Sequence, residues 1–132
     1  MKYKVFSLLL LMCAVLLGGC SGGGSSGAVY HKITPQEAKS MMDGAAGAYT
    51  LVDVRTQSEF QAQRIAGAIL IPYDQIAGLA ASELPDKDAL IFTYCRTGVR
   101  SSAAAHTLVG LGYTNVYDIG GIQSWPYGTV SG

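Results

Sequence analysis

The side chains best suited to chemistry lie in one stretch, residues 94–102 (YCRTGVRSS). Its only cysteine, Cys95, is followed by two guanidinium groups, Arg96 and Arg100. A thiolate is a better nucleophile than a thiol, and nearby positive charges lower the pKa of a cysteine below its free value of about 8.5. Gly98 lets the backbone between the arginines adopt conformations that a Cβ would forbid. The stretch therefore predicts a reactive thiolate; the alternative is that Cys95 is a small buried hydrophobic residue.

The elements on either side of this stretch would direct backbone N–H groups at the thiol. An apolar run at 89–93 predicts a buried strand, and an Ala-rich run at 101–110 predicts a helix that Ser101 opens. In open α/β sheets, ligands bind beyond the carboxyl ends of the strands. A loop that closes on a helix N-terminus favours an anion at that point. We expect the Cys95 thiolate itself to be such an anion.

The first 19 residues have the composition of a secretory signal peptide. Lys2 and Lys4 precede an apolar run at 5–17, which is short for a membrane span. The run ends in Leu-Gly-Gly-Cys at 17–20, which resembles the lipobox of bacterial lipoproteins and implies a lipidated Cys20 at the start of the mature chain. Residues 20–30 would then be a flexible Gly/Ser tether to the cell envelope, outside the cytoplasm. The alternatives are an ordinary signal peptide cleaved nearby and an uncleaved anchor.

The cysteine count supports a reactive thiol independently of the loop. Cys13 would leave with the signal peptide and Cys20 would carry lipid, so Cys95 has no partner in the mature chain. Exported proteins usually pair their cysteines as structural disulfides, so an unpaired one indicates a chemical role.

The charge distribution gives no support to nucleic-acid binding. The full chain has a formal net charge of zero, and loss of Lys2 and Lys4 leaves seven basic and nine acidic residues, a net charge of −2. The sequence has no basic run and no basic residues interleaved with aromatics. His31, His106 and one cysteine do not make a metal-binding pattern, so we expect neither a metal nor a cofactor.

Strands alternate with short helices along the rest of the chain. Thr34 and Glu37 form a capping box, with Pro35 at the first helical position. The pattern predicts an α/β fold with a small parallel sheet and helices on both of its faces. We expect strands at 31–33, 49–54, just before 72, 89–93 and 116–119, and helices at 34–43, 56–63, 73–83 and 101–110, with a helical turn at 120–125.

From residue 34 to residue 125 the sequence resembles a rhodanese-like sulfurtransferase domain, and we place the domain at 31–132. Four motifs occur in order and at suitable spacing: Asp53-Val54-Arg55 with Glu59-Phe60, Ile65-x-Gly67-Ala68-x-x-Ile71-Pro72, Cys95-Arg96-x-Gly98-x-Arg100-Ser101, and Gly120-Gly121-x-x-x-Trp125. Each motif alone is a weak signal, and the four together are specific.

The resemblance implies a monomeric enzyme that transfers sulfane sulfur through a cysteine persulfide. Cys95 would take sulfur from a small anionic donor such as thiosulfate and pass it to cyanide or a thiol. The donor would be held by the loop that follows, and Asp53 and Arg55 would act in support; a strand-end cap is the alternative role for Asp53. The implied substrate-binding residues are Arg96, Thr97, Gly98, Val99 and Arg100.

The sequence departs from the family pattern at three places outside the loop. Gln63 and Arg64 stand where a Gly-His pair is common, Leu70 replaces an asparagine, and Pro126 shortens the last helix. The change at 63–64 concerns the surroundings of the site, so substrate access could differ.

Two other functions share these features. Related phosphatases and arsenate reductases have a Cys-x5-Arg loop, whereas the loop here is Cys-x4-Arg, which fits a sulfur-sized centre better. A persulfide carrier or sulfur-sensing module without turnover would have the same sequence pattern. In either case we expect the protein to contact the membrane only through its lipid anchor.

Overall fold

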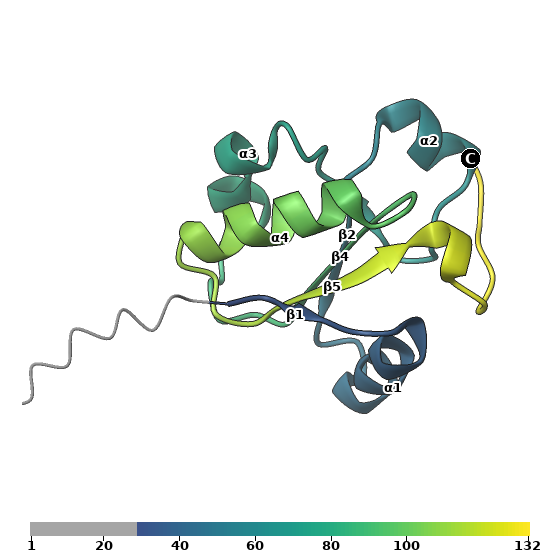
Figure 1. The fold of residues 1–132 in the computed structure, drawn as a ribbon, viewed down its shortest axis with the longest axis horizontal. Helices are drawn as coiled ribbons and strands as arrows, with labels where there is room; N and C mark the ends of the chain where they lie inside the picture. The colour runs from purple at the N-terminus through teal and green to yellow at the C-terminus, as the bar shows by residue number, and fades with distance from the viewer. Residues whose placement is uncertain (1–28) are drawn as a thin grey trace, which may run out of the picture.

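The computed structural model describes residues 29–132 (Figure 1). The predicted signal peptide, the lipidation of Cys20 and nearly all of the tether lie outside the described residues. The elements, in chain order, are β1 (His31–Lys32), α1 (Pro35–Ala45), β2 (Thr50–Asp53), α2 (Gln57–Ala62), β3 (Ile69–Leu70), α3 (Ile76–Glu83), β4 (Ile91–Cys95), α4 (Val99–Gly110), β5 (Val116–Gly121) and the 3₁₀ turn η1 (Ile122–Ser124).

The five strands form one parallel sheet in the order β1-β5-β4-β2-β3. β4 lies at its centre between β2 and β5, and all five of its residues are buried. Such a strand must be apolar on both faces, and the sequence of β4, IFTYC, meets that requirement. The order places Cys95 at the carboxyl end of the central strand.

Helices cover both faces of the sheet, which confirms the predicted fold class. Figure 1 shows α3 and α4 on one side of the strands and α1 on the other. Ile91 of β4 packs in the core under α3 and α4, whereas Phe92 and Tyr94 pack in the core under α1. Each large apolar side chain so buried contributes roughly 1.5 to 3 kcal/mol to folding. These two cores fix β4, and with it the start of the cysteine loop.

Two helix starts follow from local hydrogen bonds. The Thr34 hydroxyl accepts from the Glu37 N–H while the Glu37 carboxylate accepts from the Thr34 N–H, as predicted. Thr56 and Glu59 form the same capping box at the start of α2. That second box fixes the position of Glu59 beside the cysteine loop.

Several predicted boundaries are wrong. β4 runs to Cys95 rather than ending at 93, because Cys95 still pairs with Gly121 of β5. α4 begins at Val99 with Gly98 as its N-cap, so Ser101 does not open the helix. α3 begins at Ile76 rather than at 73, and α1 continues through Gly44 to Ala45.

Candidate active site around Cys95

Cys95 lies at the base of a loop that closes on the N-terminus of α4. The thiol is 1% exposed and free. The Gly98 N–H donates to Cys95 Sγ at 3.0 Å, and the Ser101 hydroxyl oxygen lies 3.5 Å from the same sulfur. The predicted backbone cradle for an anion is therefore present around this thiol.

Two opposing effects set the acidity of Cys95. Burial raises the pKa of the thiol, because a low-dielectric environment disfavours the charged form. Hydrogen bonds from Ser101, from the Gly98 N–H and from the Thr97 N–H favour the thiolate, and their sum exceeds the effect of burial. The pKa of Cys95 is lowered overall, as a sulfur nucleophile requires.

Glycines at three positions allow the loop to fold tightly. Gly98 has φ of 111°, a conformation that L side chains rarely adopt. Gly121 lies directly under the loop, and a Cβ there would come within 2.2 Å of the Arg96 carbonyl oxygen. Gly120 has φ of 84°, so it too has a backbone conformation that L side chains rarely adopt. The Gly-Gly motif at the end of β5 thus provides room for the cysteine loop.

Asp53 and Arg55 form a buried ion pair that supports the wall of the site. Arg55 Nη2 lies 2.6 Å from Asp53 Oδ2, and Asp53 Oδ1 also accepts from the Arg55 N–H. Asp53 thus caps the end of β2 and also neutralises the Arg55 guanidinium, and its supporting role in the reaction stays a prediction. Arg55 Nη2 also donates to the Gln63 carbonyl oxygen, which ties the end of β2 to the segment after α2.

Arg100 is engaged by Glu59 across the site. Arg100 Nη1 and Nη2 donate to the two Glu59 carboxylate oxygens at 2.8 and 2.9 Å. This bidentate pair lowers the pKa of Glu59 to about 2. The Arg100 guanidinium thereby holds α2 against the start of α4, and its expected donor-binding role stays a prediction.

Arg96 is the third arginine of the site, besides Arg55 and Arg100. It is exposed, and no carboxylate among residues 29–132 forms an ion pair with it. Arg96 lines a hollow of about 290 Å³ beside the cysteine loop. The other lining residues are Arg55, Glu59, Ala62, Gln63, Ile122 and Gln123.

The structure brings the predicted site residues together, with two additions. Thr97 contributes its N–H, and Val99 is 77% exposed at the rim of the loop. Glu59 and Ser101 also belong to the site, although sequence reasoning assigned neither a role in it. The Thr56–Glu59 capping box and the position of Ser101 one turn into α4 were the available signals.

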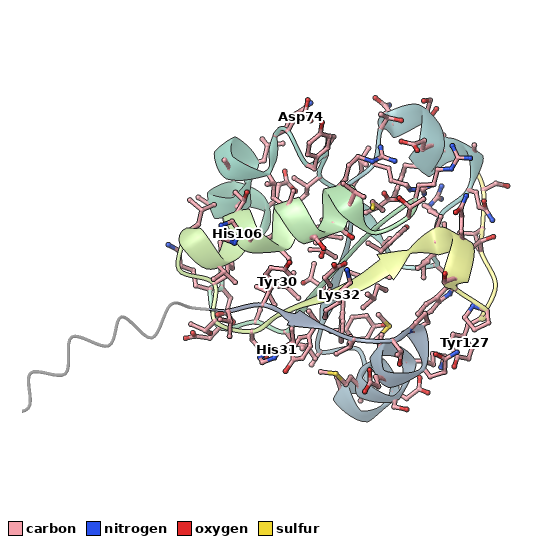
Figure 2. All side chains as sticks on the ribbon, in the orientation of Figure 1. Tyr30, His31, Lys32, Asp74, His106 and Tyr127 are labelled. Atoms are coloured by element: carbon pink, nitrogen blue, oxygen red, sulfur yellow. The ribbon has the colours of Figure 1, made fainter. Side chains whose placement is uncertain are left out.

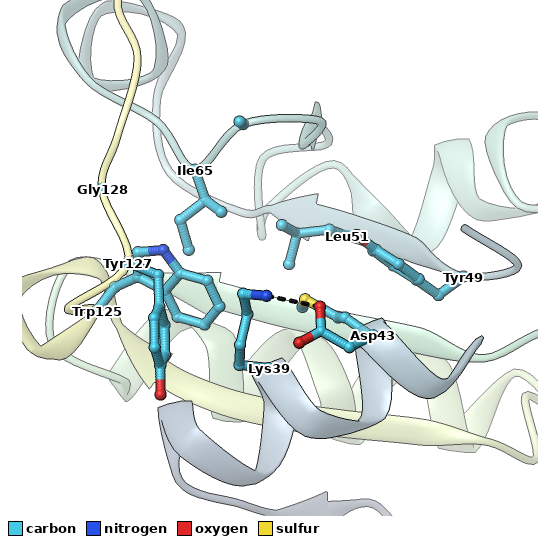
Figure 3. Close-up of a pocket in the computed structure, with 10 residues that line it drawn as sticks. Lys39, Asp43, Tyr49, Leu51, Ile65, Trp125, Tyr127 and Gly128 are labelled. Atoms are coloured by element: carbon cyan, nitrogen blue, oxygen red, sulfur yellow. Dashed lines mark hydrogen bonds and ion pairs between the residues drawn. The ribbon is translucent and has the colours of Figure 1, made fainter. Parts of the chain in front are cut away.

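A second cavity, of about 160 Å³, contains none of the cysteine-loop residues. Figure 3 shows Lys39 and Asp43 of α1 joined by an ion pair beside the aromatic rings of Trp125 and Tyr127. Within residues 29–132 the Trp125 Nε1 is buried without a hydrogen-bond partner. The lining of this cavity has no cysteine, serine or threonine, and its Lys39 ammonium is paired with Asp43, so we place the chemistry at Cys95.

Residues 29–132 hold no group of three side chains able to bind a metal ion. Figure 2 shows His31 of β1 and His106 of α4 in different parts of the molecule. The described helices are all too short or too polar to cross a membrane.

Comparison with known proteins points to one family. A family model described as "Rhodanese-like domain" matches residues 34–126. Thiosulfate sulfurtransferase PspE of Escherichia coli (strain K12) is 35% identical over 72 residues, which cover 54% of this chain and 69% of PspE. Thiosulfate sulfurtransferase GlpE of Pseudomonas savastanoi pv. phaseolicola is 32% identical over 97 residues, which cover 73% of this chain and 87% of GlpE.

The solved structures agree with the sequence relatives. A structure described as "rhodanese with anions from E. coli" is 33% identical and superposes with a TM-score of 0.61. The match covers 64% of this chain and the whole of that one.

Proposed function

Because this chain belongs to the rhodanese-like domain family, we propose that its sulfurtransferase activity proceeds through a persulfide on Cys95, from a thiosulfate-type donor to a thiol or cyanide. The observation that carries the proposal is the 3.0 Å hydrogen bond from the Gly98 N–H to Cys95 Sγ. The same loop presents Arg96, which forms no ion pair with any residue of 29–132. Relatives named thiosulfate sulfurtransferases support the choice of donor.

The first half-reaction loads Cys95. The thiolate attacks the outer sulfur of thiosulfate, a new Sγ–S bond forms, and the bond between the two thiosulfate sulfurs breaks. Sulfite leaves with the electron pair of that bond. Arg96 attracts the dianionic donor and the leaving sulfite, and the fraction of Cys95 that is already a thiolate reacts without a general base.

The second half-reaction regenerates the thiolate. An acceptor thiolate or cyanide attacks the outer sulfur of the persulfide, and the Sγ–S bond breaks with its electron pair returning to Cys95. The N–H groups of Thr97 and Gly98 and the Ser101 hydroxyl stabilise the charge on Sγ in both steps. The same cradle serves thiolate and persulfide, which is why the reaction can proceed in two separate steps.

The engagement of Arg100 disfavours the phosphatase alternative. Phosphate-ester chemistry on a cysteine loop needs a guanidinium that faces the bound phosphate. Arg100, at the end of this loop, instead gives two hydrogen bonds to Glu59. We expect no turnover of p-nitrophenyl phosphate by the full chain.

Initial-rate kinetics test the proposal. With thiosulfate and cyanide both varied, thiocyanate formation should give parallel double-reciprocal lines, and Cys95→Ser should abolish it. Intersecting lines, or activity that survives in Cys95→Ser, would contradict a persulfide on Cys95. A protein that accepts sulfur but does not release it would instead be a carrier.

We also propose that the enzyme is attached to the cell envelope through a lipid on Cys20. The support is the pattern at residues 1–20, which lies outside the described part of the chain. Metabolic labelling with a radioactive fatty acid should mark the full chain and not Cys20→Ser. Equal labelling, or none in either protein, would contradict lipidation at this residue.

A further inference from the structure

We infer that the hollow beside the cysteine loop binds the sulfur acceptor, and that Arg96 selects small thiols that carry a carboxylate. This inference rests on the proposed function and names the acceptor class of the same site. Arg96 follows Cys95 directly, and it shares the hollow with Gln63 and Gln123. Cys95 itself does not line the hollow, so the acceptor reaches its persulfide from the side of Arg96.

The charges around the hollow leave one cation available. Arg55 is paired with Asp53, and Arg100 is paired with Glu59. Among residues 29–132, Arg96 has no such partner, so it is the uncompensated positive charge that an entering molecule meets. Guanidinium groups favour carboxylates because their planar donors match the two oxygens.

The neutral lining suits a small polar organic molecule. The Gln63 side-chain nitrogen donates to the Thr129 hydroxyl, which fixes the carboxamide at the edge of the hollow. Gln123 is exposed on the other lining segment, next to the buried Ile122. The two carboxamides offer hydrogen bonds without adding charge. Arg96 therefore decides whether the hollow prefers an anionic or a cationic acceptor.

The size of the hollow exceeds what cyanide requires. Its volume is about 290 Å³. A two-atom anion leaves most of this space empty. The hollow also admits a thiol with a short carbon chain and a carboxylate.

The chemistry with such an acceptor is balanced. The acceptor thiolate attacks the outer sulfur of the Cys95 persulfide, and a new S–S bond joins that sulfur to the acceptor. The bond to Sγ breaks, and its electron pair leaves Cys95 as a thiolate. The acceptor departs as a persulfide, and no oxidant or reductant is consumed.

The test is the rate at which three thiols discharge preloaded protein. The full chain is treated with thiosulfate, desalted, and mixed with 3-mercaptopropionate, 2-mercaptoethanol or cysteamine. Loss of the added sulfur is followed by intact mass. Each rate is divided by the thiolate concentration and then by the rate of the same thiolate with a small uncharged disulfide, because thiolate nucleophilicity also rises with thiol pKa. We expect 3-mercaptopropionate to react about tenfold faster than cysteamine, as a charged hydrogen bond at a partly exposed site would give.

Two variants assign the preference. Arg96→Gln should bring the ratio close to one, whereas Lys32→Gln, which removes an exposed charge from β1, should leave it unchanged. In the wild type, added salt should reduce the ratio, because exposed charges are screened.

Equal rates for the three thiols on loaded protein, or a preference that survives Arg96→Gln, would overturn the inference while leaving the persulfide mechanism intact. Failure of Cys95 to take up sulfur at all would overturn both.

Discussion

The Ser101 hydroxyl lies 3.5 Å from Cys95 Sγ, although one residue lies in the first turn of α4 and the other ends β4. Ser101 is fully buried, and its hydroxyl donates to the Gly98 and Gly120 carbonyl oxygens while its oxygen accepts from the Cys95 thiol. Once the thiolate forms, that thiol proton is gone and the Ser101 proton can turn to the sulfur instead.

Ser101→Ala should make Cys95 less acidic. The hydrogen bonds from Ser101 lower the pKa of the thiol, so their partial loss moves the pKa upward. We expect iodoacetamide to alkylate Cys95 about threefold more slowly at pH 7, since a long hydrogen bond to a charged group contributes modestly. The pH profile of the alkylation rate measures this, with Ser82→Ala as the control. An unchanged profile would rule out the proposed role of Ser101.

Glu59→Gln should cost about 1 kcal/mol of unfolding free energy at pH 7, because it breaks a bidentate, half-buried pair. The folded-state pKa of Glu59 is about 2, below the ordinary value of 4.5. The stabilisation is therefore complete above pH 4.5 and is lost as pH falls toward 2.

Urea unfolding of wild type and Glu59→Gln between pH 2.5 and pH 7 measures this dependence. The difference in unfolding free energy between the two proteins should narrow only at the acid end. Glu83→Gln, on the exposed end of α3, is the control and should show no such trend. A difference that grows on acidification would have the wrong sign for this pair.

Gly121→Ala should destabilise the fold by about 1 to 3 kcal/mol, because its Cβ would meet the Arg96 carbonyl oxygen at 2.2 Å. The loop would be displaced, so sulfur transfer should slow as well. Gly78→Ala is the matched control, since no atom lies within 4 Å of its Cβ and the helix gains roughly 0.5 to 1 kcal/mol. Thermal unfolding compares the two, and equal stability of both variants would refute the close approach.

Asp53→Asn should cost about 3 kcal/mol, because it leaves the Arg55 guanidinium buried without its charge partner. Asp43→Asn removes a carboxylate from the exposed pair with Lys39 and should cost less than about 1 kcal/mol. Urea unfolding of the two variants gives the comparison. Similar losses would mean that the Asp53–Arg55 pair contributes no more than a surface pair.

The local part of the site was predictable from sequence. A cysteine between an apolar strand and a helix, followed by a glycine, indicated the anion-binding loop, and Cys95 occupies that position. The alternation of five predicted strands with four predicted helices likewise indicated a parallel sheet. The predicted ends of helices and strands were wrong where a single backbone contact decides them. One example is the end of β4, which the pairing of Cys95 with Gly121 sets.

The pairing of charges was not predictable in the same way. Glu59 and Arg100 are 41 residues apart, and only the packing of α2 against the start of α4 brings them together. Arg96 and Arg100 both follow Cys95 closely in sequence. The fold pairs Arg100 with Glu59 and leaves Arg96 at the hollow. Two residues of one type in one motif thus acquire different roles.

Intact mass of the full chain after thiosulfate treatment tests the central claim most directly. We predict a gain of one sulfur atom that cyanide removes, and no gain in Cys95→Ser, which keeps Cys13 and Cys20. The same gain in Cys95→Ser, or none in wild type whose Cys95 is shown to be a free thiol, would contradict a persulfide mechanism at this residue.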